Sequence, residues 1–120
     1  MIAPADIAAA RAFARDWVAA WNSHDLDRIL SHYAEDVEFR SRKAARLVGA
    51  GTVKGKAALR DYWSKALAGQ PDLNFTLGAV FLGHEMLTLA YRNQRGIEAT
   101  ETFQFGTDGR VIRSAACHAD

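Results

Sequence analysis

The stretch from residue 17 to residue 40, WVAAWNSHDLDRILSHYAEDVEFR, constrains the fold more than any other part of the sequence. Its apolar residues first recur at helical spacing, and Trp17 and Trp21 share one helical face. After a polar corner, residues 26–33 continue such a face, and residues 37–41 then alternate between apolar and polar. The change from a period of about 3.6 to one of about 2 predicts a helix, a corner, a short helix and a strand. Large aromatic side chains inside such a corner would line a cup-shaped pocket.

Length and composition are those of one globular domain. A chain of 120 residues supplies one hydrophobic core, so we expect a single domain over residues 1–120. Apolar residues make up 49% and charged residues 24%, with a net charge of +1, which is ordinary for a globular protein and argues against nucleic-acid binding. The densest basic cluster has no interleaved aromatic residue, and we interpret it as a solvated strand edge or loop; it comprises Arg40, Arg42, Lys43 and Arg46.

The expected location is the cytoplasm. Cys117 is the one cysteine, so an internal disulfide is excluded and no oxidising compartment is implied. The first residues, MIAPADIAAARAFARDW, place Asp6, Arg11 and Arg15 at helical spacing, which indicates a helix rather than a signal peptide. No apolar run approaches the ~20 residues of a membrane span, so we expect no membrane partner.

Helices dominate the first half of the sequence and strands the second. The patterns predict helices at about residues 5–22, 26–33 and 55–68, and strands at about 37–42, 73–82, 86–93, 97–105 and 111–118, with a loop and a weak strand between 44 and 53. Turns at residues 83–84, 94–96 and 108–109 join the last strands into a meander. This order predicts an α+β fold, in which three N-terminal helices pack in the concave face of a strongly curved antiparallel sheet.

Four motifs carry a resemblance to a known family. They are W-N-S-H-D-L-D-x-I-L at 21–30, Y-A-E-D-V-E-F at 33–39, G-K-A-A-L-R-D-Y-W at 55–63 and F-x-F-x-x-D-G-R-V at 103–111. Together with the strand order, they resemble the SnoaL-like branch of the nuclear transport factor 2-like superfamily. The resemblance implies a cone-shaped α+β barrel with an apolar pocket. It also implies a homodimer through the outer sheet face, where Thr100, Thr102, Gln104 and Arg113 would lie. It does not define one chemistry, because the superfamily includes isomerases, cyclases, dehydratases, epoxide hydrolases and non-enzymatic domains.

The steroid isomerases of this superfamily provide a residue-by-residue comparison. They use a phenol on the first helix, a carboxylate base and a protonated carboxylic acid. Aligning the shared motifs places Trp17 at the phenol position, Ser41 at the base position and Glu101 at the position of the protonated acid. Because two of these roles are unfilled or changed, we do not expect a ketosteroid isomerase.

Glu101 is the strongest candidate for a catalytic residue. In the segment ATETFQF at residues 99–105, it shares a face with an alanine and two phenylalanines. Burial without a charged partner raises the pKa of a carboxyl by up to ~3–5 units, and a neutral carboxylic acid can donate a hydrogen bond or a proton. Two alternatives stay open: the two faces are reversed, or Arg92 or Arg60 pairs with Glu101 in a structural ion pair.

His118 is the second candidate. Counting outward from a two-residue turn at 108–109, the sequence predicts the pairs Phe105–Ile112, Phe103–Ser114, Glu101–Ala116 and Ala99–His118. Glu101 and His118 are then diagonal neighbours on one face, with ~7–8 Å between their backbones. They would act as acid and base, or would hold the polar end of a ligand. The alternative is an exposed histidine in a frayed segment.

Other residues are expected to line the pocket around these two. The wall comprises Trp17, Trp21, Tyr33, Phe39, Trp63 and Phe103, with Ser41, Tyr91 and Ser114 as polar lining. Ser41 or Tyr91 would orient a ligand, although simple packing is the alternative for each. We expect no metal and no cofactor, since the four histidines show no paired spacing with carboxylates. His24 and His32, near the first corner, are expected at the surface.

Two functions are compatible with these residues. The first is cofactor-free acid–base catalysis, of isomerase, cyclase or dehydratase type, on a small apolar carbonyl or cyclic compound. Glu101 would be the acid or base and His118 its partner. The second is a non-catalytic module that binds a small apolar ligand or acts through dimerisation. The lack of a carboxylate at Ser41 favours the second function, and an inward Glu101 beside His118 favours the first.

Overall fold

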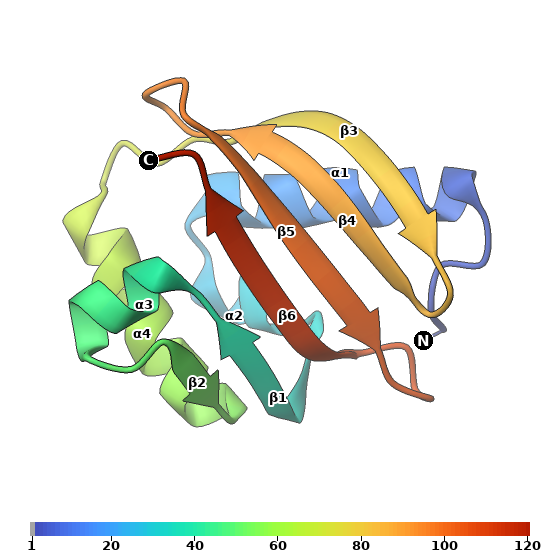
Figure 1. Ribbon diagram of the computed structural model, residues 1–120, viewed down its shortest axis with the longest axis horizontal. Helices are drawn as coiled ribbons and strands as arrows, with labels where there is room; N and C mark the ends of the chain where they lie inside the picture. The colour runs from blue at the N-terminus through green and yellow to red at the C-terminus, as the bar shows by residue number, and fades with distance from the viewer. Residues whose placement is uncertain (1) are drawn as a thin grey trace.

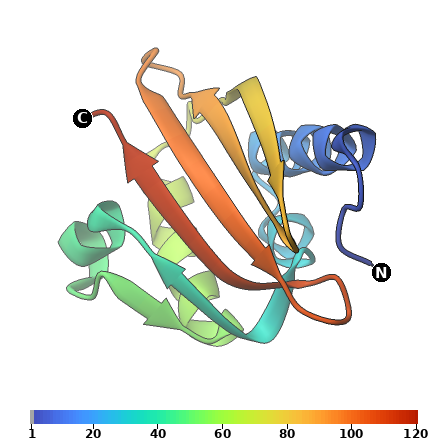
Figure 2. The same cartoon turned by 45° about the vertical axis from the view of Figure 1, so that its right-hand side comes forward.

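The computed structural model describes residues 2–120, and Figure 1 shows a curved sheet with helices against one of its faces. The helices are α1 (Ile7–Ser23), α2 (Leu26–Leu30), α3 (Arg42–Val48) and α4 (Lys56–Gly69). The strands are β1 (Tyr33–Arg40), β2 (Thr52–Lys54), β3 (Thr76–Gly83), β4 (Met86–Arg92), β5 (Glu98–Phe105) and β6 (Val111–His118). Helix α1 packs against β3 and helix α4 against β1, and Figure 2 shows both on the same side of the sheet. The predicted α+β fold is confirmed.

The six strands form one open, mixed sheet in the order β2-β1-β6-β5-β4-β3. The predicted sheet was wholly antiparallel, whereas β1 and β6 run parallel, with Phe39 beside Ser114. Hairpins fix the relative directions from β3 to β6, but β1 precedes α4 and is joined to β6 by no hairpin, so its direction is free of that constraint. Because β2 and β3 are both edges, the sheet curves without closing into a complete barrel.

One helix was not predicted. Residues 42–48 form α3, where the sequence pattern indicated a strand end and a loop. The Ser41 hydroxyl accepts a hydrogen bond from the Lys43 backbone N–H at 3.1 Å, and Gly49 ends the helix with φ +79°. A serine N-cap and a left-handed glycine are standard helix signals. The alternation of residues 37–41 concealed them, because it appeared to continue through Ser41.

The closing hairpin has almost the predicted register. Phe103 pairs with Ser114, Glu101 with Ala116 and Ala99 with His118. Phe105, however, pairs with Val111 instead of Ile112, because the register shifts by one residue after Gln104. A bulge of this kind adds one residue to one strand and increases the local twist. The predicted pairs further along the hairpin, which position the candidate site, are therefore confirmed.

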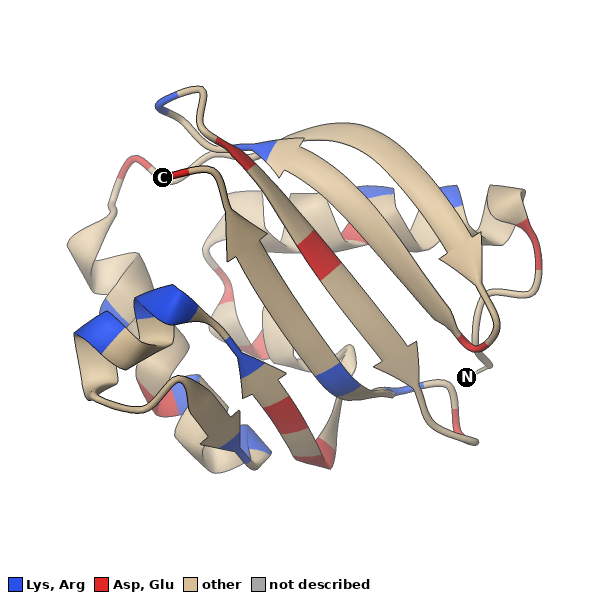
Figure 3. Ribbon diagram, in the orientation of Figure 1, with Lys and Arg blue, Asp and Glu red and all other residues tan. Residues whose placement is uncertain are grey.

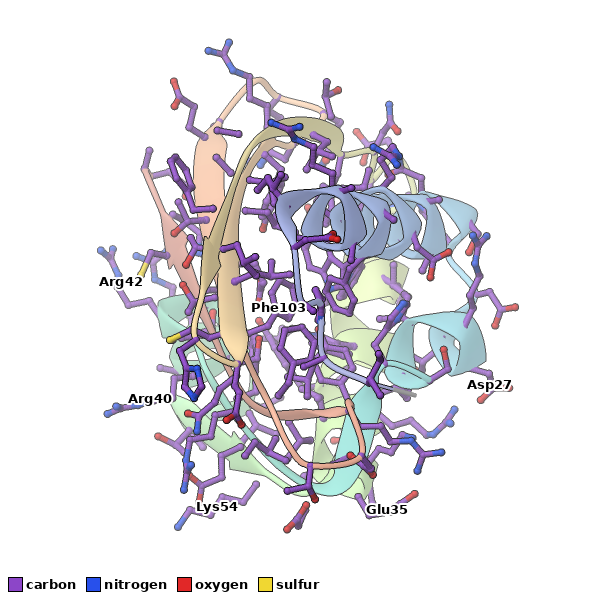
Figure 4. The ribbon with its side chains drawn as sticks, turned by 90° about the vertical axis from the view of Figure 1, so that its right-hand side faces the viewer. Asp27, Glu35, Arg40, Arg42, Lys54 and Phe103 are labelled. Atoms are coloured by element: carbon purple, nitrogen blue, oxygen red, sulfur yellow. The ribbon has the colours of Figure 1, made fainter. Side chains whose placement is uncertain are left out.

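Aromatic residues fill the core between the helices and the sheet. Phe103 is fully buried, and Figure 4 shows it in the interior beside α1, while Arg40 and Arg42 point outward. The expectation of a surface position is wrong for His32, which is 7% exposed. Its Nε2 atom lies 2.8 Å from Asp16 Oδ2, and its ring packs edge-on against Phe13 at 5.3 Å. His24 is half-buried, with Nε2 2.8 Å from the Leu73 carbonyl oxygen.

Candidate functional site

A central cavity lies between the inner face of the sheet and helices α1 and α4. Its volume is about 70 Å³, which is small beside the ~300–1,000 Å³ of common ligand pockets. Its aromatic wall comprises Trp17, Trp21, Phe39, Tyr62, Trp63, Phe75 and Tyr91. Half-buried polar residues surround the mouth: Lys43, Gln70, Asn93 and His118. A compound bound here would be small, or would extend through the mouth.

The aromatic wall is held by edge-to-face and tilted ring contacts. The rings of Trp21 and Trp63 meet at 5.0 Å in a T-shaped arrangement, and those of Phe75 and Tyr91 lie 4.4 Å apart. The Trp17 ring contacts Tyr91 at 5.6 Å. Such pairs each contribute about 0.5–1.5 kcal/mol beyond the burial of their area. The wall is therefore packed and apolar.

Glu101 lies in this wall with its carboxyl buried. Strand β5 alternates buried and half-buried residues along its length, and Glu101, 4% exposed, is on the buried face. The Ser114 hydroxyl donates a hydrogen bond to Oε2 at 3.1 Å, and within residues 2–120 no cation pairs with the carboxyl. Burial raises the pKa of Glu101 to about 8, and the Ser114 hydrogen bond opposes this rise only in part. The carboxyl is therefore mostly protonated at neutral pH.

Tyr33 and Ser114 support Glu101 from behind the wall. The Trp17 indole N–H donates a hydrogen bond to the Tyr33 hydroxyl at 3.0 Å. Burial, together with the charge that Glu101 would carry when ionised, raises the pKa of Tyr33 well above its ordinary value. Tyr33, Phe103 and Ser114 were expected to line the pocket, but they lie outside its lining. The reason is that the rings of Trp17 and Trp63 contact Phe103 and Tyr33 respectively and separate them from the cavity.

Two tyrosines face the cavity as neutral phenols. Burial raises the pKa of Tyr62 and of Tyr91, and a nearby ionised Glu101 would add to both increases. The Ser41 hydroxyl interacts with Tyr62 and lowers its pKa slightly. Ser41 lines the cavity as predicted in position, but its oxygen also caps α3. Tyr91 is 6% exposed and lines the cavity, so its phenol is available as a hydrogen-bond donor.

His118 lines the same cavity as Glu101, from the diagonal position that the strand register predicts. It lines the cavity and is half-buried, and within residues 2–120 no hydrogen bond joins it to Glu101. Burial lowers the pKa of His118, and the positive charge of Lys43 lowers it further, while Asp120 acts in the opposite direction. His118 is therefore neutral at pH 7, when it can both donate and accept a hydrogen bond.

Sequence reasoning missed several lining residues. Lys43 was missed because α3 was interpreted as a loop, which hid its position in the first turn of the helix that Ser41 caps. Phe75 was placed within the predicted strand at 73–82 with no face assigned to it, whereas in the structure it lies just before β3. Gln70 and Asn93 lie in connections, where a periodic pattern gives no direction for a side chain.

The arrangement of helices on a curved, open sheet defines the cone-shaped α+β class. A SnoaL-like domain model matches residues 14–118, and the chain therefore belongs to the SnoaL-like family. It is 41% identical to a SnoaL-like protein of unknown function from Burkholderia thailandensis, with a TM-score of 0.91 and coverage of 98% of this chain and 100% of the other.

More distant structures share the fold. A protein from Agrobacterium tumefaciens, provisionally described as an isomerase of the SnoaL-like family, is 17% identical, with a TM-score of 0.74 and coverage of 92% and 97%. The epoxide hydrolase/cyclase-like enzyme SalBIII, described in pyran ring formation in salinomycin, is 16% identical, with a TM-score of 0.74 and coverage of 95% and 93%. No curated protein sequence gives a significant match. The family thus has structural neighbours of isomerase and cyclase type.

None of the helices in residues 2–120 is long and apolar enough to cross a membrane. Within the same residues, histidine, cysteine, aspartate and glutamate side chains form no group of three or more that could hold a metal ion.

Proposed function

We propose that this protein is a cofactor-free acid–base enzyme, of isomerase, cyclase or dehydratase type, acting on a small, largely apolar carbonyl or cyclic compound. The observation that carries the proposal is the buried Glu101 carboxyl, which lines an aromatic cavity and lacks a charged partner. A neutral carboxylic acid at this position would donate a hydrogen bond or a proton to a substrate oxygen. The Tyr91 phenol would donate a hydrogen bond that orients this oxygen. His118, at the mouth of the cavity, would accept and release protons.

A second buried donor supports oxygen binding in the same cavity. The Trp21 indole N–H lines the wall and has no hydrogen-bond partner within residues 2–120. Buried donors in proteins nearly always have a partner, so an unpartnered donor beside a neutral acid is consistent with a bound carbonyl. Ser41 supports the second candidate function, non-catalytic ligand binding. This serine stands where the steroid isomerases carry a carboxylate base, and its hydroxyl caps α3.

The experiment that tests the proposal measures carbonyl chemistry directly. Small cyclic ketones and enones, such as 2-cyclohexen-1-one, would be incubated with the protein in deuterium oxide. Proton NMR would follow exchange next to the carbonyl and any rearrangement. Exchange faster than in buffer, and dependent on Glu101, is expected of an enzyme. Compounds that bind to the cavity without any exchange or rearrangement would favour the non-catalytic function.

We also propose a homodimer formed through the outer face of the sheet. Thr100, Thr102 and Gln104 are half-buried on this face, opposite the inward residues of β5. The strip is weakly charged, as the mainly tan central strands of Figure 3 illustrate, and Glu38 and Arg113 at its side have opposite signs. These two side chains pair within one chain, with 4.0 Å between Arg113 Nε and Glu38 Oε2, so they add little net charge to this face. We further propose a cytoplasmic location, with which the exposed Cys117 thiol is compatible.

Thr102→Glu tests the dimer. The substitution would bring two carboxylates together near the axis, so the variant should elute as a monomer, whereas the wild type should have twice the mass of one chain by light scattering. Arg11→Glu, on the exposed side of α1, is the control and should stay dimeric. A wild-type protein that is monomeric at high concentration would contradict the dimer.

A further inference from the structure

Positive charge collects where the central cavity opens. Lys43 lines the cavity and also two adjoining grooves, of about 260 and 450 Å³. Five cationic residues line these grooves, and we call them the basic rim: Arg42, Lys43, Arg46, Lys65 and Arg95. They come from α3, α4 and the turn between β4 and β5. Figure 3 shows the blue segments of α3 beside the ends of β1 and β6.

One carboxylate faces this rim, and two cations hold it. Asp120 Oδ1 lies 3.5 Å from Lys43 Nζ, and Oδ2 lies 3.7 Å from Arg95 Nη2. Lys65 is paired elsewhere, with Asp61 at 3.2 Å. Within residues 2–120, Arg42 and Arg46 form no ion pair. The rim therefore has more positive charge than its own carboxylate neutralises, which creates a local attraction for an anion.

The position of Asp120 indicates what the rim can hold. Its carboxylate bridges Lys43, which lines the apolar, aromatic cavity, and Arg95, which lines the adjoining groove. The side chains of Lys43 and Asp120 are partly shielded, at 27% and 32% exposure, whereas that of Arg95 is 60% exposed. We propose that the basic rim binds the carboxylate of the substrate, and that Asp120 occupies this position until the substrate displaces it. The substrate would be a small amphiphilic carboxylate, with its apolar body against the tryptophans and its carbonyl or ring next to Glu101.

This inference rests on the proposed function for the enclosed end of the ligand, while the rim itself provides the preference for an anion. The volume of the cavity agrees with a ligand that is enclosed only in part. A space of about 70 Å³ encloses only part of a ring compound, so the remainder reaches the rim. Two charge-assisted contacts at a partly exposed site should favour a carboxylate over its neutral amide by roughly five- to tenfold in affinity.

The test compares two probes that differ in charge alone. Binding of 3-phenylpropanoate and of 3-phenylpropanamide at pH 7 would be followed by the fluorescence of the tryptophans in the cavity wall. The carboxylate should bind roughly five- to tenfold more tightly at low salt, and the preference should shrink as salt screens the charges. Lys43→Gln and Arg95→Gln should each reduce this preference at least twofold, and Asp120→Asn should strengthen carboxylate binding severalfold by removing the competitor.

Lys54→Gln is the matched control, because Lys54 lies on β2 and its ion pair is with Glu38; the carboxylate preference should be unchanged. Equal affinity for the two probes, no binding of either, or an unchanged preference in Lys43→Gln would overturn the inference. Glu101→Gln separates this inference from the proposed function, because it removes the proposed acid and leaves the basic rim unchanged. A preference for the carboxylate without any carbonyl exchange would contradict the proposed catalysis but support carboxylate binding at the basic rim. Carbonyl exchange without a preference for the carboxylate would support the catalysis and contradict binding at the basic rim.

Discussion

Glu101→Gln should abolish carbonyl exchange while the protein stays folded. The amide has nearly the same shape as the neutral acid, and its oxygen can still accept the Ser114 hydrogen bond, but it cannot transfer a proton. Loss of a positioned general acid typically reduces the rate by about 100- to 10,000-fold. The measurement is the exchange rate of a responsive ketone in deuterium oxide, for wild type and variant at equal concentration. A variant that retains the wild-type rate would eliminate Glu101 as the acid.

The same substitution should also change the dependence of stability on pH. Because the folded-state pKa of Glu101 is about 8 and the unfolded value is about 4.3, the folded protein retains this proton when the unfolded chain has lost it. Wild-type stability should therefore decrease as the pH rises from about 4.3 to about 8, with a cost of about 3 kcal/mol at pH 7. Glu101→Gln lacks this cost and should be at least as stable as wild type at neutral pH. This result would separate loss of chemistry from loss of fold.

Phe103→Ala should cause the largest loss of stability. Phe103 is fully buried, and its ring packs edge-on against Phe13 at 5.1 Å and Trp17 at 5.5 Å. Removing a buried phenyl ring leaves a cavity, because packed neighbours relax only in part, and typically costs 3–5 kcal/mol, or about 4 kcal/mol here. Urea denaturation followed by circular dichroism would measure the change in the free energy of unfolding.

Leu47→Ala is the comparison for Phe103→Ala. Leu47 is 50% exposed on α3, so its truncation should change the free energy of unfolding by no more than about 0.5 kcal/mol. Similar losses in the two variants would mean that Phe103 does not anchor the layer between α1 and the sheet. The fold of the site depends on this layer, since Trp17 contacts both Phe103 and the cavity.

The sequence predicted the architecture wherever local periodicity and turn chemistry agree. The alternation of residues 99–105 and the Asp108-Gly109 turn were enough to pair Glu101 with Ala116 and to place Glu101 inward. Local patterns could not predict that β1 lies parallel to β6, because that contact depends on how the helices return the chain to the sheet. The Ser41 cap of α3 was overlooked because a serine fits both an alternating strand and a helix start.

The candidate site was harder to predict than the fold. The buried position of Glu101 follows from the apolar neighbours on its strand face, and the cavity position of Tyr91 follows in the same way. The lack of a hydrogen bond between Glu101 and His118 does not follow, because strand register defines backbone neighbours and not side-chain directions. Phe103 and Tyr33 were assigned to the cavity as inward-facing aromatic residues, but Trp17 of α1 and Trp63 of α4, which pack against them, line the cavity instead. The position of Lys43 could not be predicted, because this residue lies on α3, which the sequence pattern did not predict.

The titration of Glu101 tests the central claim most directly. Carbon-13 NMR of protein labelled at the glutamate carboxyls would follow the Glu101 resonance, assigned from its absence in Glu101→Gln, between pH 4 and 10. Burial without a charged partner predicts a pKa of about 8, well separated from those of exposed glutamates near about 4.3. A Glu101 resonance that titrates with the exposed glutamates would mean that the carboxyl is solvated or paired, and it would contradict the proposed acid.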